Sequence, residues 1–188
     1  MRIIVGITGA SGSILGIRLL QALRSLEVET HLVMSRWAKA TLMHETSYTV
    51  GEVEKLASVV HASENQAASI SSGSFKTDGM VVAPCSMKTL AAIRTGYSDN
   101  LLCRAADVVL KERRKLVLLA RESPLNEIHL ENMLTLTRMG VLIFPPVPAF
   151  YSLPKSMDEV VDQIVGRVLD QFGLEMPGVS RWNGFGGA

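Results

Sequence analysis

Cysteine and histidine are scarce in this chain of 188 residues. Two cysteines are too few for a disulfide framework, and they lack the spacing of zinc ligands. The four histidines form no metal-binding motif either. A metal site is therefore not expected among these side chains, which are Cys85, Cys103, His31, His44, His61 and His129.

Long apolar runs and an excess of charge of one sign are also missing. No stretch reaches the length of a transmembrane helix, and the first residues enter an apolar strand without a signal-peptide pattern. A formal net charge of +1 provides no broad field for nucleic acid or anionic membranes, so any anion must be bound by local groups. These absences predict a cytoplasmic protein that binds neither nucleic acid nor membrane.

Apolar residues, in contrast, are plentiful. They make up 47% of the chain, and the mean hydropathy is +0.24. A chain of this length can bury the core of one domain, and we expect identical copies to cover part of the remaining apolar surface. The composition thus predicts a single-domain homo-oligomer.

The apolar pattern alternates between short strand-like runs and helix-like stretches. Such repeated βα units predict an α/β fold with a doubly wound, mostly parallel sheet and helices on both faces. The pairs of strand and helix are residues 3–7 and 13–26, 29–34 and 36–45, 79–84 and 86–96, 115–120 and 125–139, and 141–145 and 156–172.

Three segments fall outside this alternation. A polar insertion over residues 46–78 is expected to hold one short helix near residues 50–60, and an extra helix is expected over residues 101–113. The glycine-rich end of the chain is expected to be mobile unless Trp182 packs against something. We therefore predict one domain over residues 1–175 and a tail over residues 176–188.

The first strand leads into a loop with the features of a phosphate site. Gly9 and Gly12 allow close approach of the backbone, Ser11 and Ser13 add hydroxyl donors, and the following helix start favours negative charge. The loop does not match G-x-G-x-x-G, and the second strand ends in Ser35 rather than an acid. This pattern favours a mononucleotide such as FMN over NAD, although a plain strand-to-helix turn would look alike.

Polar side chains follow several of the other predicted strands. Because ligands of parallel sheets bind outside the carboxyl ends of the strands, these residues predict a polar site that accepts anions. Ser86 and Thr89 could instead be plain helix caps. The strand-end segments are Ser11, Ser35, Pro84-Cys85-Ser86-Met87-Lys88-Thr89, Arg121-Glu122 and Pro145-Pro146-Val147-Pro148.

Six segments in the same order along the chain carry a resemblance to a known family. On them the chain resembles the UbiX-type flavin prenyltransferases, particularly members associated with non-oxidative hydroxyarylic acid decarboxylases. The segments are Thr8-Gly9-Ala10-Ser11-Gly12, Pro84-Cys85-Ser86-Met87-Lys88-Thr89-Leu90, Arg104 to Arg113, Arg121-Glu122-Ser123-Pro124-Leu125, Ile128 to Leu134, and Pro148-Ala149-Phe150-Tyr151.

The resemblance implies a Rossmann-like flavoprotein with a defined reaction. Such an enzyme joins the dimethylallyl group of dimethylallyl phosphate to reduced FMN across flavin N5 and C6, without a metal. The product, prenylated FMN, then serves a partner decarboxylase of the UbiD type. The resemblance also implies a homododecamer.

The resemblance further implies two sets of binding residues. The flavin site comprises Gly9, Ala10, Ser11, Ser35, Ser86, Met87, Lys88, Thr89 and Arg121. The prenyl donor and its phosphate are assigned to Lys111, Arg121, Tyr151, Arg167 and Trp182. Cationic groups there would stabilise the leaving phosphate. Without the resemblance, Lys111 and Arg167 would read as part of a solvated helix face.

Glu45, Glu122 and Ser11 are implied as catalytic residues. A carboxyl group beside flavin and phosphate could move a proton, and Ser11 could reach the flavin ring as well as phosphate. From the sequence alone, an ion pair for Glu122 and a helix-end carboxylate for Glu45 are simpler readings. Trp182 would supply a π face near the developing cation, or simply pack.

Two further residues look chemical but are assigned structural roles. Cys85 follows a strand without a positioned histidine and is expected to pack beside the flavin, and His129 is expected to be structural or interfacial. Three alternative functions remain: an FMN-dependent oxidative decarboxylase of a cysteine-derived substrate, a phenolic acid decarboxylase acting alone, and a flavin-binding subunit of such an enzyme. The first would carry asparagine in a Pro-x-Met-Asn strand end, where this chain has Pro84-Cys85-Ser86-Met87.

Overall fold

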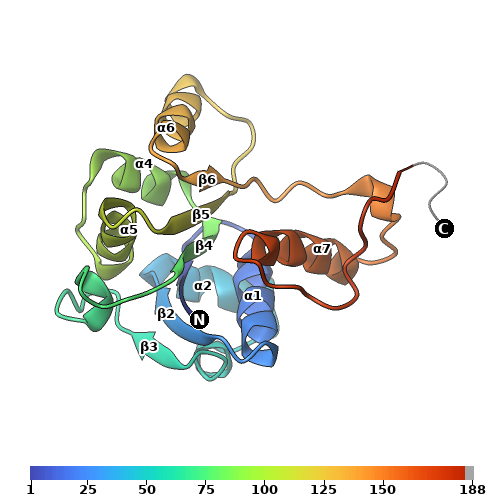
Figure 1. The fold of residues 1–188 in the computed structure, drawn as a ribbon, viewed down its shortest axis with the longest axis horizontal. Helices are drawn as coiled ribbons and strands as arrows, with labels where there is room; N and C mark the ends of the chain where they lie inside the picture. The colour runs from blue at the N-terminus through green and yellow to red at the C-terminus, as the bar shows by residue number, and fades with distance from the viewer. Residues whose placement is uncertain (185–188) are drawn as a thin grey trace.

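Six of the apolar runs form one parallel sheet in the computed structural model, which describes residues 1–184 (Figure 1). The strands are β1 (Arg2–Ile7), β2 (Glu29–Met34), β3 (Val59–His61), β4 (Gly79–Cys85), β5 (Lys115–Ala120) and β6 (Leu142–Ile143). Their order is β3-β2-β1-β4-β5-β6, and every neighbouring pair is parallel. The prediction of a parallel α/β sheet is confirmed.

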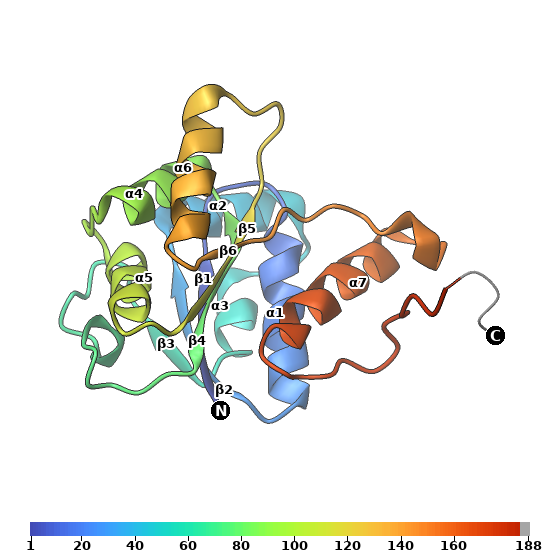
Figure 2. The same cartoon turned by 45° about the horizontal axis from the view of Figure 1, so that its top comes forward.

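Helices cover both faces of this sheet, as predicted (Figures 1 and 2). One core packs beneath α1 (Ser13–Ser25), α2 (Arg36–Glu45), α3 (Val50–Glu54) and α7 (Met157–Asp170). The other packs beneath α4 (Met87–Thr95), α5 (Leu101–Lys111), α6 (Glu127–Arg138) and the short helix η1 (Ser69–Ser71). Neighbouring residues of β1 face opposite cores, Ile3 the first and Ile4 the second, because side chains alternate along a strand.

Helix α1 lies unusually close to the sheet. A Cβ atom at Gly16 would lie 2.4 Å from the carbonyl oxygen of Ala83 in β4, so only glycine permits this approach. The close packing fixes the start of α1 relative to the carboxyl ends of β1 and β4.

The polar insertion differs from its prediction. The capping box of Thr49 and Glu52 starts α3, but this helix ends at Glu54 instead of continuing to about residue 60. The chain then forms β3, an edge strand that pairs with β2. The strand expected over residues 141–145 is likewise shorter, since Pro145 and Pro146 have no N–H group to donate.

The order of the strands creates a crossover point between β1 and β4. From β1 the chain moves outward through β2 to β3, and then returns to β4 on the other side of β1. In open parallel sheets, ligands bind at such a point, outside the carboxyl ends of the strands.

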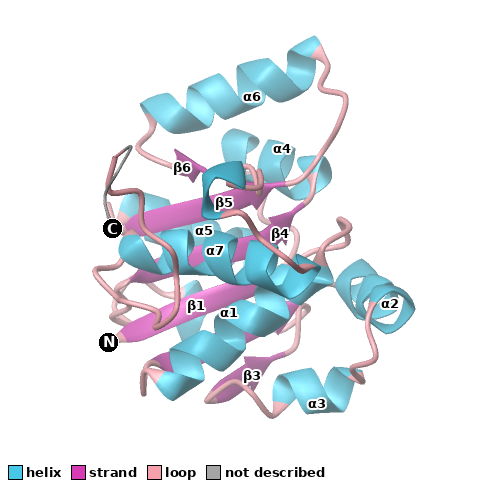
Figure 3. Cartoon of the chain, turned by 90° about the vertical axis from the view of Figure 1, so that its right-hand side faces the viewer, coloured by secondary structure: helices cyan, strands magenta, loops and turns pink. Residues whose placement is uncertain are grey.

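The segment after α7 lies back along that helix (Figure 3). Val179 covers Gly166, where an added Cβ would lie 2.4 Å from the Val179 side chain, and Arg181 pairs with Asp170. Residues 176–184, which we call the C-terminal strap, are thus bound to α7, whereas residues 185–188 of the predicted mobile tail lie outside the described part. Within residues 1–184, no helix is both long enough and apolar enough to cross a bilayer.

Candidate active site

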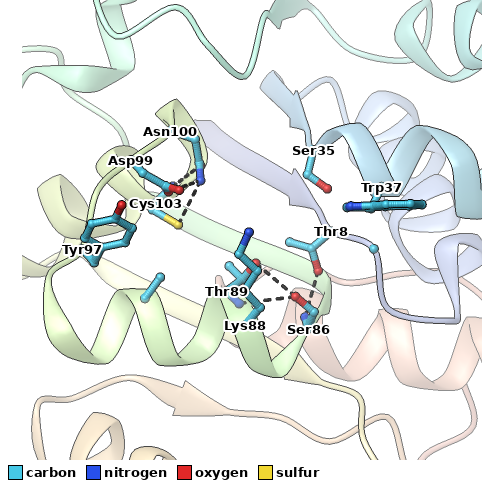
Figure 4. A pocket seen from close by; sticks show the side chains of 12 residues that line it. Thr8, Ser35, Trp37, Ser86, Lys88, Thr89, Tyr97, Asp99, Asn100 and Cys103 are labelled. Carbon is cyan, nitrogen blue, oxygen red and sulfur yellow. Dashed lines mark hydrogen bonds between the residues drawn. The ribbon is translucent and has the colours of Figure 1, made fainter.

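A cavity of about 250 Å³ opens at the carboxyl ends of β1, β2 and β4, beside the crossover point (Figure 4). In the close-up, Ser35 and Trp37 lie on one side, Ser86, Lys88 and Thr89 line the base, and residues 97–103 form the opposite side. The lining residues are Thr8, Gly9, Ser35, Trp37, Ser86, Lys88, Thr89, Ala92, Tyr97, Asp99, Asn100 and Cys103. The strand-end rule therefore located the cavity correctly.

Two helix N-termini meet at this cavity. Ser35 caps α2, where its Oγ accepts the N–H of Ala38 at 3.1 Å, and Ser86 caps α4, where its Oγ accepts the N–H of Thr89 at 3.3 Å. The capping alternative for Ser86 is thus correct, but a cap uses only the oxygen of a hydroxyl. The Ser35 hydrogen stays available, as does that of Thr89, whose Oγ1 accepts from Ser86 at 3.1 Å. Hydroxyl donors and two positive helix ends suit a phosphate.

Thr8 holds the base of the cavity in place, a role that the sequence analysis missed. Its side chain is 1% exposed, and Oγ1 donates to the carbonyl of Pro84 at 2.8 Å. The same oxygen accepts the N–H of Ser86 at 2.8 Å. One hydroxyl therefore joins the end of β1 to the start of α4.

A second corner of the site brings together Ser11, Glu45 and Arg121. The Glu45 carboxylate accepts the N–H groups of Gly12 at 2.9 Å and Ser13 at 3.2 Å, and a hydrogen bond from Ser11. Burial raises the pKa of Glu45, but these hydrogen bonds and the Arg121 charge bring it below its ordinary value. The loop predicted to hold phosphate thus holds the chain's own carboxylate, because both anions suit a helix start.

Other residues predicted for the flavin site border these two groups. Ala10 and Met87 are half-buried and follow the lining residues Gly9 and Ser86 in the sequence, and Lys88 is exposed and lines the cavity. Glu122, next to Arg121, is exposed and accepts the N–H of Ser123 at 3.1 Å. Within residues 1–184, Glu122 makes no ion pair, so the ion-pair alternative is not what the structure shows.

Except for Arg121, the residues predicted for the prenyl donor lie elsewhere. Tyr151, in the short helix η2 (Phe150–Ser152), meets Trp182 edge to face with ring centroids 5.7 Å apart, beside α7, which carries Arg167. Figures 1 and 2 place η2, drawn in orange, beyond α7 and far from α4. Lys111 ends α5 at the amino edge of the sheet, where it pairs with Glu112. One copy of the chain therefore does not bring the two predicted sets together.

Burial decides the roles of Cys85 and His129. Cys85 is fully buried in the second core, and burial raises the pKa of its thiol, so it is not an activated nucleophile. His129 belongs to the capping box of α6, with its backbone N–H donated to Asn126. The structural role of His129 is thus confirmed, and Cys85 packs in the core, whereas its place beside the flavin stays a prediction.

Several lining residues escaped the sequence analysis because they lie away from strand ends. Tyr97, Asp99, Asn100 and Cys103 come from the turn before α5 and its first residues, where Asn100 donates to Asp99 at 2.7 Å. Trp37 could have been identified as a lining residue from the sequence, since it follows the strand-end residue Ser35 by two positions. An added Cβ at Gly9 would lie 2.5 Å from the Trp37 Cβ, so this contact needs glycine at position 9.

The hydrogen-bonding groups and aromatic side chains of the cavity fit a flavin mononucleotide. Hydroxyls and helix starts suit its phosphate, the polar wall suits its hydroxylated chain, and Trp37 and Tyr97 offer aromatic surface for its ring. Among residues 1–184, no group of three His, Cys, Asp or Glu side chains is placed to hold a metal ion.

Comparisons with known proteins agree with this fit. The Flavoprotein family model matches residues 1–169. A probable UbiX-like flavin prenyltransferase of Bacillus subtilis is 64% identical over 184 residues, which are 98% of this chain and 90% of the relative.

Two crystal structures share both fold and sequence with the chain. A dodecameric FMN-dependent UbiX-like decarboxylase from Escherichia coli O157:H7 is 63% identical with a TM-score of 0.97, over 98% of this chain and all of that one. AnUbiX in complex with FMN and dimethylallyl pyrophosphate is 59% identical, also with a TM-score of 0.97, over 98% of each chain. The chain therefore belongs to the Flavoprotein family and, within it, to the UbiX-like flavin prenyltransferases.

Proposed function

We propose that this chain transfers a dimethylallyl group from a phosphate ester to reduced FMN, which it holds in the strand-end cavity. The convergence of the α2 and α4 N-termini, with hydroxyls of Ser35 and Thr89 free to donate, is the observation that carries this assignment. Phosphate oxygens accept hydrogen bonds from such donors, and the helix ends favour their charge. Gly9, Ser86 and Lys88 complete the lining near that phosphate.

The transfer needs neither an oxidant nor a metal, because the bonds and protons balance between the two substrates and the products. The C–O bond of the phosphate ester breaks, and the carbon forms a bond to flavin N5. The N5 proton leaves with the phosphate. A second bond then joins the other end of the allylic group to flavin C6. Flavin C6 loses its proton in this step, and the central carbon of the allylic group gains one. Glu45, held as a carboxylate, and Glu122 are the proposed proton carriers, with Ser11 positioned by Glu45.

We assign the donor's phosphate to Tyr151, Arg167 and Arg121, with Trp182 beside the allylic group. Tyrosine and arginine donate hydrogen bonds to phosphate, and the arginine charge stabilises the leaving group. Because η2, which carries Tyr151, lies beyond α7 and far from α4 in its own chain (Figure 1), we propose that a working site takes these donor groups from a second copy. Lys111, at the amino edge, can contribute only in the same way.

A homo-oligomer, and specifically a homododecamer, follows as part of this proposal. A dodecamer is recorded for the relative from Escherichia coli O157:H7. Apolar side chains left exposed on α6, Ile128, Leu130 and Leu134, suit burial between copies. We further propose that prenylated FMN passes to a decarboxylase of the UbiD type, and that both proteins act in the cytoplasm.

Anaerobic incubation with reduced FMN and dimethylallyl phosphate tests the proposal. Mass spectrometry should detect a five-carbon adduct of FMN, and parallel reactions with the monophosphate and the pyrophosphate should identify the preferred donor. FMN-loaded protein that forms no adduct with either donor would reject the proposal.

The same preparation separates the alternatives. A phenolic acid offered to this chain alone should release no carbon dioxide until a product-charged decarboxylase is added. Release by this chain alone would favour the phenolic acid decarboxylase. Oxidation of a cysteine-containing peptide with loss of carbon dioxide would favour the cysteine decarboxylase, and FMN binding with no reaction at all would favour a flavin-binding subunit.

A further inference from the structure

Gln163 is a buried amide for which the sequence analysis gave no role. It lies in α7, and its side chain is 5% exposed. Its Nε2 donates to two groups, the carbonyl oxygen of Ser180 and the hydroxyl oxygen of Tyr151, each at 3.0 Å. One side chain thus joins α7, the short helix η2 and the C-terminal strap.

These contacts fix which way the amide points. The Ser180 carbonyl can only accept a hydrogen bond, so the amide atom beside it must be the nitrogen. The nitrogen has two hydrogens, and the second is donated to Tyr151. The Tyr151 oxygen is therefore an acceptor toward Gln163, and its own hydrogen must point elsewhere. A hydroxyl that accepts one hydrogen bond also becomes a stronger donor.

The surroundings of Tyr151 suit an anion as the acceptor of that hydrogen. Its side chain is 43% exposed, so a ligand can reach the hydroxyl. Arg167 follows Gln163 by one helical turn on the same side of α7, and it shares the Asp170 carboxylate with Arg181 of the strap, so two arginines here face one acid. Trp182 lies against the ring of Tyr151 and limits its rotation.

We propose that Gln163 is a positioning residue for the prenyl donor, acting through Tyr151. By donating to the tyrosine oxygen, it keeps the phenolic hydrogen directed outward, toward a phosphate ester held by Arg167. Gln163 itself does not touch the donor. This inference rests on the proposed function, because it assigns a role within the same donor site.

Substitution by methionine tests this role, since Gln163→Met keeps the length of the side chain and removes both hydrogen bonds. At saturating reduced FMN, KM for dimethylallyl phosphate should rise about tenfold, the effect of one lost hydrogen bond to a charged group. FMN retention should not change. The Tyr151→Phe variant should show a similar rise, and Gln163→Met added to Tyr151→Phe should have no further effect.

That non-additivity distinguishes positioning from simple packing. If Gln163 only stabilised the strap through Ser180, its substitution would raise KM equally with and without the Tyr151 hydroxyl, and the inference would be wrong. Gln163→Glu provides a second variant of nearly the same shape. Its carboxylate accepts rather than donates, which turns the tyrosine hydrogen inward, so KM should rise at least as much as in Gln163→Met.

The chain supplies a matched control on α1. Gln21 donates its Nε2 to the hydroxyl of Tyr48 at 3.0 Å, which is the same pair of groups, and neither residue lines the cavity or belongs to the donor set. Gln21→Met should leave KM for the donor unchanged. Unchanged KM in both Gln163 variants, with wild-type protein active, would overturn the inference alone, whereas wild-type protein that forms no adduct would overturn the proposed function and the inference together.

Discussion

The strand-end cavity and the region around α7 are built in different ways. The cavity rests on backbone features: buried strands that end together, helices that start there, and glycine where Trp37 comes close. The α7 region depends on long side chains that tie separate segments together, Gln163 to Tyr151 and Arg181 to Asp170. The lining of the cavity comes from one chain, while the α7 region carries groups such as Tyr151 that lie apart from that cavity in the same copy (Figure 1).

The largest effect should come from a negative charge in the cavity. Aspartate caps a helix as well as serine does, so Ser86→Asp should keep α4 intact. Its carboxylate would repel the FMN phosphate and weaken FMN binding by about 100-fold or more, as expected for like charges at close range. Fluorescence titration with FMN measures this loss.

The matched control is Ser156→Asp, which changes the cap of α7 away from the cavity. It should bind FMN as the wild type does. Undiminished FMN binding by Ser86→Asp would place the phosphate elsewhere.

Replacing the proposed proton carriers should slow turnover without releasing FMN. Glu45→Gln keeps an oxygen for the N–H groups of Gly12 and Ser13 but loses the charge, and kcat should fall by about 100-fold, typical of acid–base catalysis. Glu122→Gln should also retain flavin and turn over more slowly.

The pH profile sharpens this prediction. Since the pKa of Glu45 lies below its ordinary value, its carboxylate stays charged from pH 5 to 8 and should impose no fall in kcat in that range. Full activity of either variant, measured by the rate of adduct formation, would remove that residue from the reaction.

Loss of the α7 arginine should change donor binding only. Arg167→Ala removes a charged hydrogen-bond donor, so KM for dimethylallyl phosphate should rise about 10-fold to 100-fold while FMN binding is spared. Arg24→Ala, on an exposed turn of α1, serves as the control. A variant with the donor KM of the wild type would contradict the assignment of Arg167.

The smallest effect concerns Glu29, at the amino edge of the sheet and away from the strand-end cavity. The hydrogen bonds from Arg2 and then His31 lower the pKa of Glu29 to about 2. A carboxyl group with a lowered pKa stabilises the fold at pH values above its ordinary pKa. This stabilisation is lost as the pH falls toward 2. Because the Glu29 side chain is 40% exposed, we expect Glu29→Gln to cost only about 1 kcal/mol at pH 7.

Denaturant unfolding at several pH values tests this expectation. The difference between wild type and Glu29→Gln should shrink as the pH falls below 4.5, and activity should be unchanged. A difference that stays constant with pH would mean that Glu29 acts through packing instead of charge.

Much of the cavity could be predicted because it depends on local sequence signals. Apolar runs marked the strands, and the strand-end rule pointed to Ser35 and Ser86, which both line the cavity, while their contact with FMN stays a prediction. The edge strand β3 could not be predicted in the same way, since its three residues carry too little apolar pattern. It pairs with β2, where His31 contacts His61, a residue 30 positions away in the sequence.

The wall of the cavity and the α7 region depend on contacts between segments far apart in the sequence. Gln163 meets Tyr151 and Ser180 only after the chain has folded back along α7, and no spacing rule connects these residues. Glu45 was named from the family resemblance, but its position on the N–H groups of Gly12 and Ser13 appears only in the structure. The separation of Lys111 from the cavity likewise follows from the direction of α5.

Mixed assemblies test most directly the claim that each working site draws on two copies. Ser86→Asp and Arg167→Ala chains can be co-expressed with different tags, and the mixed oligomers isolated. Their sites should carry one, both or neither of the two defects. If the cavity comes from one copy and the α7 groups from another, about one quarter of the sites should carry neither defect. At a donor concentration near the wild-type KM, adduct formation should then return to about one quarter of the wild-type rate. A rate no higher than that of the two variants assayed separately would contradict the account.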